Sequence, residues 1–347
     1  MSCHTVADRG PWVHIRWLCL IFIAIIAFPS PGAAQTFKYC TVSSSDADLG
    51  SHSSFDLAST GQESAGAGGL ACTPPLALLS TSYIKVKVES SMFLLTGGPD
   101  NQTIPFTISA TQGGTAIATG NEFDFTSFQL LNLFSGPGGS LPLYVKTQAQ
   151  PGLRAGIYSG TVNLRWYFSV CTLGVLVICD FSESPGFQRP ILLTPLNWGS
   201  GVLTTMTVTM IVENDCAIAA PDLDFGSAPL AGSFAEATQT ITIRCSAGAA
   251  YSVGLSDGNN FDGGWRRMRR AATSDYLRYE IYQVPSSGIR WGSVGAERRS
   301  SAAAQVNPGI YDGIVQQGFT YGARIDPAQT TPQVGHYVDN IVLDIEF

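Results

Sequence analysis

The sequence has little charge, few histidines and no helical periodicity, and each shortage narrows what the chain can be. Only 13% of its 347 residues are charged and the formal net charge is −7, so the basic surface of a nucleic-acid-binding protein is missing. Beyond residue 34 the only histidines are His52 and His336, and no CxxC pair occurs, which argues against a metal centre. No nucleophile elbow, phosphate-binding loop or Ser/His/Asp arrangement is found, so we expect neither an enzyme nor a cofactor.

The only long apolar run, from Trp17 to Phe28, is too short to cross a bilayer, which takes about 20 residues. Arg9 and Arg16 precede it, and the small residues Gly32-Ala33-Ala34 follow it. This arrangement predicts a secretory signal peptide over residues 1–34, with a secreted chain that starts at Gln35. The competing interpretation, a retained membrane anchor, does not fit the length.

One sequence pattern occurs twice. The openings are Cys40-x5-Asp46-x-Asp48-Leu49-Gly50-Ser51 and Cys216-x5-Asp222-x-Asp224-Phe225-Gly226-Ser227. The endings are Gly156-x-Tyr158-x3-Val162-x-Leu164-x-Trp166-x-Phe168 and Gly335-x-Tyr337-x3-Ile341-x-Leu343-x-Ile345-x-Phe347. Matching openings and endings at the same internal offsets indicate one fold used twice. We therefore predict two homologous domains, over residues 35–200 and 201–347.

The repeat also orders the six cysteines that remain after the signal peptide. Cys40 and Cys72 hold the same places in the first copy as Cys216 and Cys245 in the second, and Cys171 and Cys179 form an additional pair without a counterpart. We predict the disulfides Cys40–Cys72, Cys171–Cys179 and Cys216–Cys245. An even number of cysteines behind a signal peptide fits an oxidising compartment.

Short segments of alternating apolar and polar residues recur through both copies. Examples are Tyr83–Val88, Thr204–Val212, Thr240–Ile243 and Ile341–Phe347. Alternation of this kind, interrupted by glycine-containing turns, is typical of half-buried strands. An all-β chain of two tandem immunoglobulin-like, pilin-type β-sandwiches is the expected architecture.

The second copy resembles a spore coat protein U domain, the pilin domain of archaic chaperone–usher fimbriae (Csu-type pili). The resemblance covers residues 205–347. Its motifs are the Cys216-to-Gly226 opening, Tyr251-Ser-Val-Gly-Leu-Ser-Asp-Gly258, Arg267-Met268-Arg269, Leu277-x-Tyr279-x-Ile281-Tyr282, Trp291-Gly292 and Gly335-x-Tyr337-x-Asp339. The first copy matches only at its ends and at Leu141–Lys146, and it lacks the Trp-Gly pair, so its membership depends on the repeat.

The resemblance implies that the second copy lacks its last strand. Pilins of this type are completed by a chaperone and then by the N-terminal extension of the next subunit, which adds a strand to an open edge. The expected acceptor edge carries four apolar residues on one face of the final strand: Ile341, Leu343, Ile345 and Phe347. The alternative is a complete domain that merely ends on a strand.

Further expectations concern the segments that precede, close and connect the two copies. Five residues precede Cys40 in the secreted chain, which is too short a segment to complete a neighbouring subunit, so we expect a position at the pilus tip. Residues 189–198 would return along the first copy as its closing strand, Gly199-Ser200-Gly201 would be the hinge between domains, and residues 202–212 would be the first strand of the second copy.

Tip subunits of such pili are adhesins, so we expect exposed apolar loops on the first copy. The candidate surface-binding residues fall in two segments: Phe128, Leu130, Leu131, Leu133 and Phe134, and the cysteine-closed loop residues Leu173, Val175, Leu176, Val177 and Ile178. For the first segment, packing into the core is an equally good interpretation. For the second, we favour exposure, because the shared core does not need an insertion that the sister copy lacks.

These observations predict a fimbrial tip adhesin, secreted through the periplasm to the cell-surface pilus. Its expected partners are a periplasmic pilus chaperone, an outer-membrane usher, an adjacent pilin subunit, and an abiotic or host surface, with no nucleic acid. The alternative functions are a non-adhesive structural subunit, a spore-coat-like surface protein, and a periplasmic carbohydrate-binding module.

Overall fold

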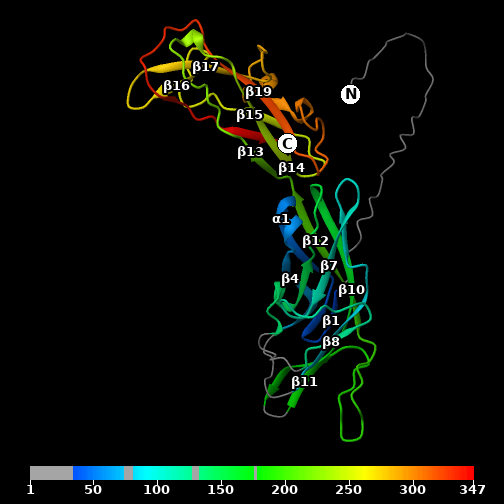
Figure 1. Cartoon of the computed structure of the whole chain (residues 1–347). Helices are drawn as coiled ribbons and strands as arrows, with labels where there is room; N and C mark the ends of the chain where they lie inside the picture. The colour runs from blue at the N-terminus through cyan, green and yellow to red at the C-terminus, as the bar shows by residue number, and fades with distance from the viewer. Residues whose placement is uncertain (1–33, 74–80, 127–132, 176–177) are drawn as a thin grey trace, which may run out of the picture.

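The structure is a computed structural model that describes residues 34–73, 81–126, 133–175 and 178–347. Its described part is nearly all β-structure and is built around two separate hydrophobic cores, one in each half of the chain (Figure 1). The predicted signal peptide and its cleavage site, residues 1–34, lie outside the described residues except for Ala34. Within the described ranges, no helix has the length and apolarity that a membrane crossing requires.

The N-terminal sandwich is a sheet of twelve strands that curls over itself. The strands are β1 (Gln35–Phe37), β2 (Cys40–Val42), β3 (Ser45–Ser53), β4 (Glu63–Cys72), β5 (Tyr83–Ser91), β6 (Leu94–Gly97), β7 (Gln102–Ser109), β8 (Glu122–Asp124), β9 (Ser140–Thr147), β10 (Gly156–Val175), β11 (Ile178–Glu183) and β12 (Val202–Glu213). Strand β7 connects the two layers, because it pairs with β6 in one and with β9 in the other. A short α-helix, α1 (Ser54–Ser59), follows β3, and a 3-10 turn, η1 (Pro137–Gly139), precedes β9.

The C-terminal sandwich has one sheet of six strands and one of three. The larger sheet contains β13 (Cys216–Ala219), β14 (Ala237–Cys245), β16 (Arg266–Arg270), β17 (Tyr276–Tyr282), β19 (Gln317–Ile325) and β20 (Tyr337–Val338); the smaller contains β15 (Ser252–Leu255), β18 (Arg299–Ser300) and β21 (Leu343–Glu346). Three 3-10 turns, η2 (Ala231–Ser233), η3 (Gly295–Glu297) and η4 (Ser301–Ala303), lie in the connections.

Each core contains a fully buried tryptophan whose indole N–H is satisfied by a backbone carbonyl. In the N-terminal core, Trp166 donates to the carbonyl oxygen of Gly68 at 2.7 Å. In the C-terminal core, Trp291 donates to the carbonyl oxygen of Val253 at 3.0 Å. Buried polar groups need such partners. The two independent cores agree with the predicted fold of two tandem β-sandwiches.

Three disulfides join Cys40 to Cys72, Cys171 to Cys179 and Cys216 to Cys245. Cys40 and Cys72 are direct cross-strand partners of β2 and β4, and Cys216 and Cys245 are direct partners of β13 and β14. The repeat therefore places equivalent cysteines at equivalent points of the two sheets, which is the pairing it predicts.

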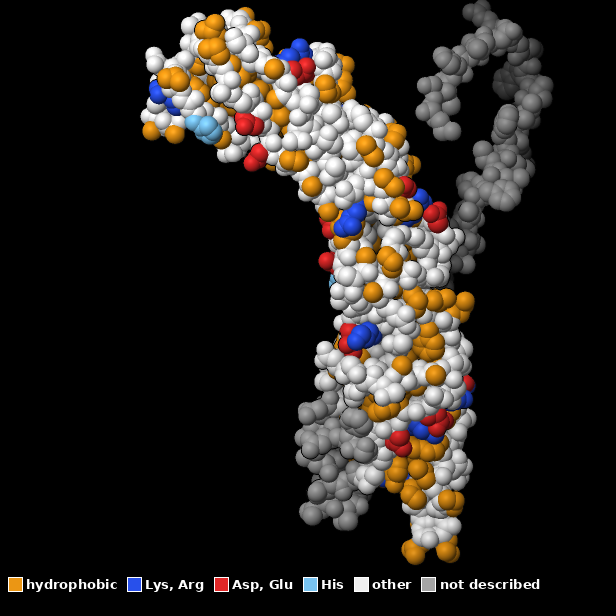
Figure 2. Space-filling model, viewed as in Figure 1, with side chains coloured by type: hydrophobic (Ala, Val, Ile, Leu, Met, Phe, Trp, Pro, Cys, Tyr) orange, Lys and Arg blue, Asp and Glu red, His pale blue; other side chains and the backbone are white. Residues whose placement is uncertain are grey.

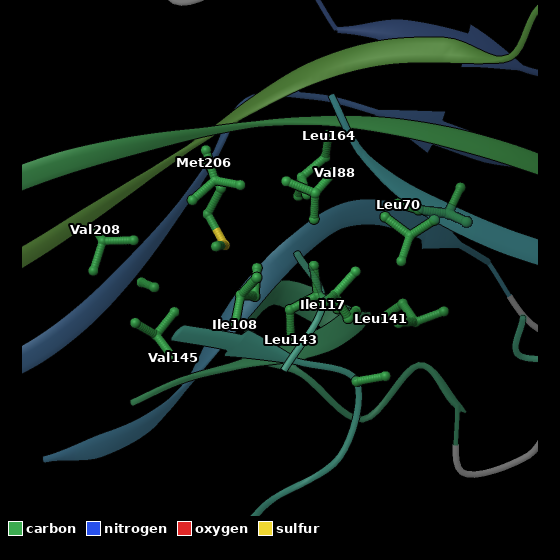
Figure 3. Close-up of a cluster of buried hydrophobic side chains, with 14 of the residues drawn as sticks. Leu70, Val88, Ile108, Ile117, Leu141, Leu143, Val145, Leu164, Met206 and Val208 are labelled. Atoms are coloured by element: carbon green, nitrogen blue, oxygen red, sulfur yellow. The ribbon is translucent and has the colours of Figure 1, made fainter. Parts of the chain in front are cut away.

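Strand β12 corrects the expected assignment of residues 202–212, which were predicted to begin the second copy. It pairs antiparallel with β10, from Val202 opposite Trp166 to Val212 opposite Gly156, and parallel with β3 on its other side. Its inward residues Met206 and Val208 belong to the N-terminal core, which also contains Leu164 (Figure 3). The alternating pattern correctly indicated a half-buried strand, but alternation does not tell which sheet the strand joins.

The segment before β12 is a second correction. Residues 189–198 form no closing strand along the first copy; they lie in a protruding hairpin, in which Gln188 bridges to Asn197 and Ile191 to Thr194. Gly199-Ser200-Gly201 connects this hairpin to β12 inside the N-terminal domain and is not the hinge between domains. The two prolines in the segment, Pro190 and Pro195, cannot donate to a ladder, which favours β12 as the closing strand.

The two domains meet at a short junction, because only Asn214 and Asp215 separate β12 from β13. Ser53, which caps α1, donates through its hydroxyl to Asp215 Oδ2 at 2.6 Å, and the hydroxyls of Ser54 and Ser246 are 2.7 Å apart. Helix α1 thus lies against the base of the second domain (Figure 1).

Candidate functional site: an open strand edge and an apolar hairpin

The two copies differ at one place that the repeat allows us to compare directly. In the first copy, the opening segment forms β3, and β12 pairs with it along its length. In the second copy, the equivalent residues 221–229 are all described by the structure and belong to no strand. Leu49 of β3 is buried, whereas its counterpart Phe225 is only half-buried. A strand equivalent to β12 is what the second copy does not have in its described residues.

The closing strands show the same difference. Val162, Leu164, Trp166 and Phe168 of β10 are all fully buried, and β12 covers the first three of them. Their counterparts Ile341, Leu343 and Ile345 in the second copy are half-buried and pack against the C-terminal core, while Phe347 is 58% exposed. Apolar side chains that water still reaches gain further burial when a strand covers them.

Strand β21 is fixed along one edge only. It pairs antiparallel with β15, from Leu343 opposite Leu255 to Glu346 opposite Ser252. Arg298 secures the strand through ion pairs of 2.5 Å to Asp344 and 3.3 Å to Glu346. No strand within the described part of the chain pairs with the other edge of β21.

This geometry creates an open edge, which we define as the unpaired side of β21 with Ile341, Leu343, Ile345 and Phe347. Unpaired backbone N–H and C=O groups on such an edge form a template for an added strand. Alternating half-buried side chains would fix the register of that strand. The sequence prediction of an acceptor edge falls on these same residues.

The candidate binding residues of the first apolar segment are only partly described. Phe128, Leu130 and Leu131 lie outside the described residues. Leu133 is buried in the N-terminal core and Phe134 packs against that core, so the expectation that these two are exposed is wrong. The physical reason is that Leu133 lies against the N-terminal core, where it lines a cavity together with Phe125 and with Leu141 of β9. Phe125 is also buried in this core.

The two cysteines of the second segment lie on β10 and β11, which pair antiparallel. Gly174 pairs with Cys179 and Val175 with Ile178, and the Cys171–Cys179 disulfide crosses the ladder. Leu176 and Val177 lie outside the described residues, and the side chains of Leu173, Val175 and Ile178 are not described either. Whether these side chains contact a surface stays a prediction.

The structure adds an apolar site that the sequence prediction missed. The turn of the 188–197 hairpin exposes Ile191 by 70%, Leu192 by 102% and Leu193 by 97%. This hairpin is the loop at the lower end of Figure 1, and hydrophobic side chains cover its tip in Figure 2. It lies at the end of the N-terminal domain that points away from the C-terminal domain.

A sequence signal for this site was available. Leu192 and Leu193 occupy the two central positions of a tight turn, since Ile191 and Thr194 exchange both of their backbone hydrogen bonds at 3.1 and 2.5 Å. Asn, Asp and Gly dominate such positions. Two leucines there violate local turn chemistry without entering a core, and such violations concentrate at functional sites.

The charged groups of the C-terminal core serve packing. Arg266 is fully buried and pairs with Glu280, which also accepts from Arg290 Nε at 2.9 Å. Among the residues that the structure describes, no group of His, Cys, Asp and Glu side chains could hold a metal ion.

Comparisons with known proteins agree with this geometry. The family model of the Spore Coat Protein U domain matches residues 31–165 and again residues 202–344. The structure is similar to a chain of the crystal structure of the CsuC–CsuE chaperone–tip adhesion subunit pre-assembly complex, from archaic chaperone–usher Csu pili of Acinetobacter baumannii. That similarity has a TM-score of 0.71 and 31% sequence identity, and covers 89% of this chain and 100% of that one. None of the curated proteins is similar enough to match.

The fold and the open edge define a pilin-type subunit of the chaperone–usher class. The chain belongs to the Spore Coat Protein U domain family, with two copies of the domain. The second match begins at residue 202, the first residue of β12. The strand with which the second match begins in sequence is therefore the strand that completes the first copy in space.

Proposed function

We propose that this chain is the tip adhesin of a chaperone–usher pilus, in which the C-terminal domain accepts a strand and the N-terminal domain attaches to surfaces. The observation that carries the proposal is the internal comparison. One strand buries the apolar face of β10 in the first copy, and the same face of β21 has no such cover within the described residues.

The position at the tip is supported by what the chain does with its own strands. Gln35–Phe37 form β1, which pairs with β2 of the same domain, and Phe37 stacks edge-on against Phe168 at 5.6 Å. Strand β12 is used within the chain as well. Within the described residues, the segment ahead of each copy is thus already paired inside the chain, which supports a subunit that accepts a strand.

The partners follow from the open edge. A periplasmic chaperone would occupy it first and keep the apolar face from water, and the N-terminal extension of an adjacent pilin would then replace the chaperone at an outer-membrane usher. After assembly, the subunit would be located at the tip of the cell-surface pilus. Its N-terminal domain would then point outward, because the acceptor edge is in the other domain.

Attachment would use the exposed tip of the 188–197 hairpin. A leucine that is fully in water gains about 1.5–3 kcal/mol on complete burial. Ile191, Leu192 and Leu193 together form an apolar end on a narrow support, which fits a hydrophobic abiotic or host surface better than a deep polar pocket.

The acceptor role can be tested on the full secreted chain by supplying the missing strand. A copy of residues 202–213, joined to Phe347 through a short glycine–serine turn, would run antiparallel to β21 as β12 does to β10. We expect the C-terminal unfolding transition to rise by about 7 °C, the shift produced by roughly 2 kcal/mol in a domain of this size.

The matched control carries the same extension with Met206→Ser, Val208→Ser and Met210→Ser in the added copy only. It keeps the length and backbone and removes the three central inward apolar side chains, while Val202 and Val212 are retained. If the parental extension stabilises the chain no more than the control does, the open edge is not an acceptor and the proposal is wrong.

A further inference from the structure

Two aromatic side chains lie at the base of the 188–197 hairpin, which we call its foot. One directly precedes the first arm of the hairpin, and the other directly follows the second arm. Phe187 precedes Gln188 and is buried, and Trp198 follows Asn197 and is half-buried. Their ring centroids are 5.5 Å apart in an edge-to-face arrangement. Both rings also contact Tyr83 of β5, at 5.9 and 6.2 Å, and Trp198 contacts Tyr167 of β10 at 6.4 Å. The two arms are thus closed against each other and against the outer face of the sheet.

Two cations complete this foot. Lys85 Nζ lies 4.4 Å from the centroid of Trp198 and 4.9 Å from that of Tyr167, and it also pairs with Glu122 at 2.8 Å. Arg189, in the first arm, lies over Phe181 at 4.0 Å and donates to Ser169 Oγ at 2.7 Å. Cation–π contacts of this kind add directional attraction to the apolar packing.

The backbone is equally constrained at Gly186 and Gly199, where the hairpin leaves the domain, a place that we call the neck. Gly186 and Gly199 cross at positive φ values of 74° and 69°, and a Cβ on Gly199 would lie 2.3 Å from the carbonyl oxygen of Pro185. Above the neck, Gln188 and Asn197 exchange backbone hydrogen bonds of 2.8 and 3.0 Å. Pro190 and Pro195 stand in the two arms and fix their own φ angles.

None of these groups belongs to the N-terminal core cluster. The apolar side chains at the hairpin tip are exposed, so the stack does not serve to bury them. The aromatic and cationic contacts at the foot therefore fix the position of the hairpin tip, which carries three exposed apolar residues. Preorganising a contact surface lowers the entropy lost when it binds.

We propose that Trp198 and Phe187 are positioning residues that immobilise the hairpin, so that Ile191, Leu192 and Leu193 contact a surface as one rigid apolar tip. This inference rests on the proposed attachment function for its purpose, but the immobilisation itself can be measured without it. Neither aromatic ring needs to touch the surface.

The experiment compares the full secreted chain with its Trp198→Ala variant by hydrogen exchange and by attachment to a hydrophobic polystyrene surface. We expect the amides of Gln188, Ile191, Thr194 and Asn197 to exchange about tenfold faster in the variant. We expect attachment to fall in parallel. The conservative variant Trp198→Phe keeps a ring in the stack and should retain both properties.

A rescue variant separates positioning from direct contact. Gln188 and Asn197 are a hydrogen-bonded antiparallel pair, whose Cα atoms stand about 5.5 Å apart, within the range of a disulfide. Adding Gln188→Cys and Asn197→Cys to Trp198→Ala should restore slow exchange and attachment once the new disulfide forms.

The outcomes are distinguishable. Unchanged exchange in Trp198→Ala would overturn the inference, and so would attachment that the disulfide does not restore while exchange is restored. If Leu192→Ser/Leu193→Ser leaves attachment unchanged, the proposed function fails at this site, and hydrogen exchange alone decides whether the foot immobilises the hairpin.

Discussion

Met206 of β12 and Val162 of β10 are direct cross-strand partners, and both side chains are fully buried in the N-terminal core. The two residues come from the two sides of the domain connection that the sequence repeat suggests. Their pairing means that the first domain cannot close its core without the strand that leads into the second domain. Folding of the N-terminal domain and the covalent link between domains are therefore one structural feature.

Shortening a buried side chain of β12 should destabilise the N-terminal domain. Met206→Ala removes a fully buried side chain and should lower the free energy of unfolding by about 2–5 kcal/mol. Urea denaturation of the full chain would show the loss as a lower midpoint of the N-terminal transition.

Thr207→Ala is the matched control, because Thr207 lies next to Met206 on the same strand and faces outward. Its cost should stay within about 1 kcal/mol, the span of strand preferences. Equal effects of the two substitutions would contradict the place of β12 in the core.

The repeat predicted much of this fold, and the reasons for its failures are instructive. It placed Cys40 opposite Cys72 and Cys216 opposite Cys245, because equivalent positions in homologous sheets carry equivalent pairs. It also placed an open edge at Ile341–Phe347, because alternation and family resemblance point to the same strand, and within the described residues β21 pairs along one edge only. Local patterns of this kind are carried by the residues themselves.

Long-range pairing was not predictable in the same way. Residues 202–212 alternate equally well for either sheet, and only β10 and β3 on both sides of β12 decide between them. Likewise, Leu133 and Leu192 are both leucines in glycine- or proline-rich loops, yet one enters the core and the other is fully exposed. Side-chain identity does not reveal whether a loop folds inward or outward.

Removing the apolar tip should reduce attachment without affecting stability. Leu192→Ser/Leu193→Ser changes two side chains that contact water almost completely, so the melting temperature should move little. Adsorption to polystyrene should fall by at least about tenfold, since each tenfold step corresponds to roughly 1.4 kcal/mol of lost contact.

The control for this variant is Ile314→Ser/Val315→Ser, which removes two exposed apolar residues from the C-terminal domain. It changes surface hydrophobicity by a similar amount at another place. If both double variants lose attachment equally, adhesion follows general hydrophobicity and does not depend on the hairpin.

Stability should fall in alkaline solution because of buried tyrosines. Burial raises the pKa of Tyr251. The pKa of Tyr279 is also raised, mainly by burial and to a smaller extent by the nearby Asp339 carboxylate. Both stay neutral in the folded chain above pH 10, where unfolded tyrosines ionise, so the unfolded state holds fewer protons and stability declines as pH rises. Each should remove about 1.4 kcal/mol by pH 11.

Urea denaturation at intervals from pH 8 to pH 11 would measure this decline. Tyr251→Phe/Tyr279→Phe removes both ionising hydroxyls, so its midpoint should depend less on pH than that of the parent. A parallel decline in the parent and in the double variant would assign the alkaline effect to other groups.

The buried ion pair behind the open edge gives the last prediction. Glu280 is the carboxylate partner of the fully buried Arg266, whose guanidinium also donates to the carbonyl oxygens of Ser256 and Trp291 at 2.7 and 2.8 Å. These bonds hold the end of β15, the strand that carries β21. Glu280→Gln would leave the buried cation without its charge partner.

Breaking a buried pair from one side costs about 3–5 kcal/mol, because the remaining charge is not compensated. We therefore expect Glu280→Gln to lower the C-terminal transition in urea by that amount. Asp262→Asn breaks the partly exposed pair with Arg267 and should cost about 1 kcal/mol or less. If the added copy of β12 stabilises the parent but no longer stabilises Glu280→Gln, the buried pair is also what keeps β15 and β21 in place for the incoming strand. If the added strand stabilises both equally, the pair supports the core alone.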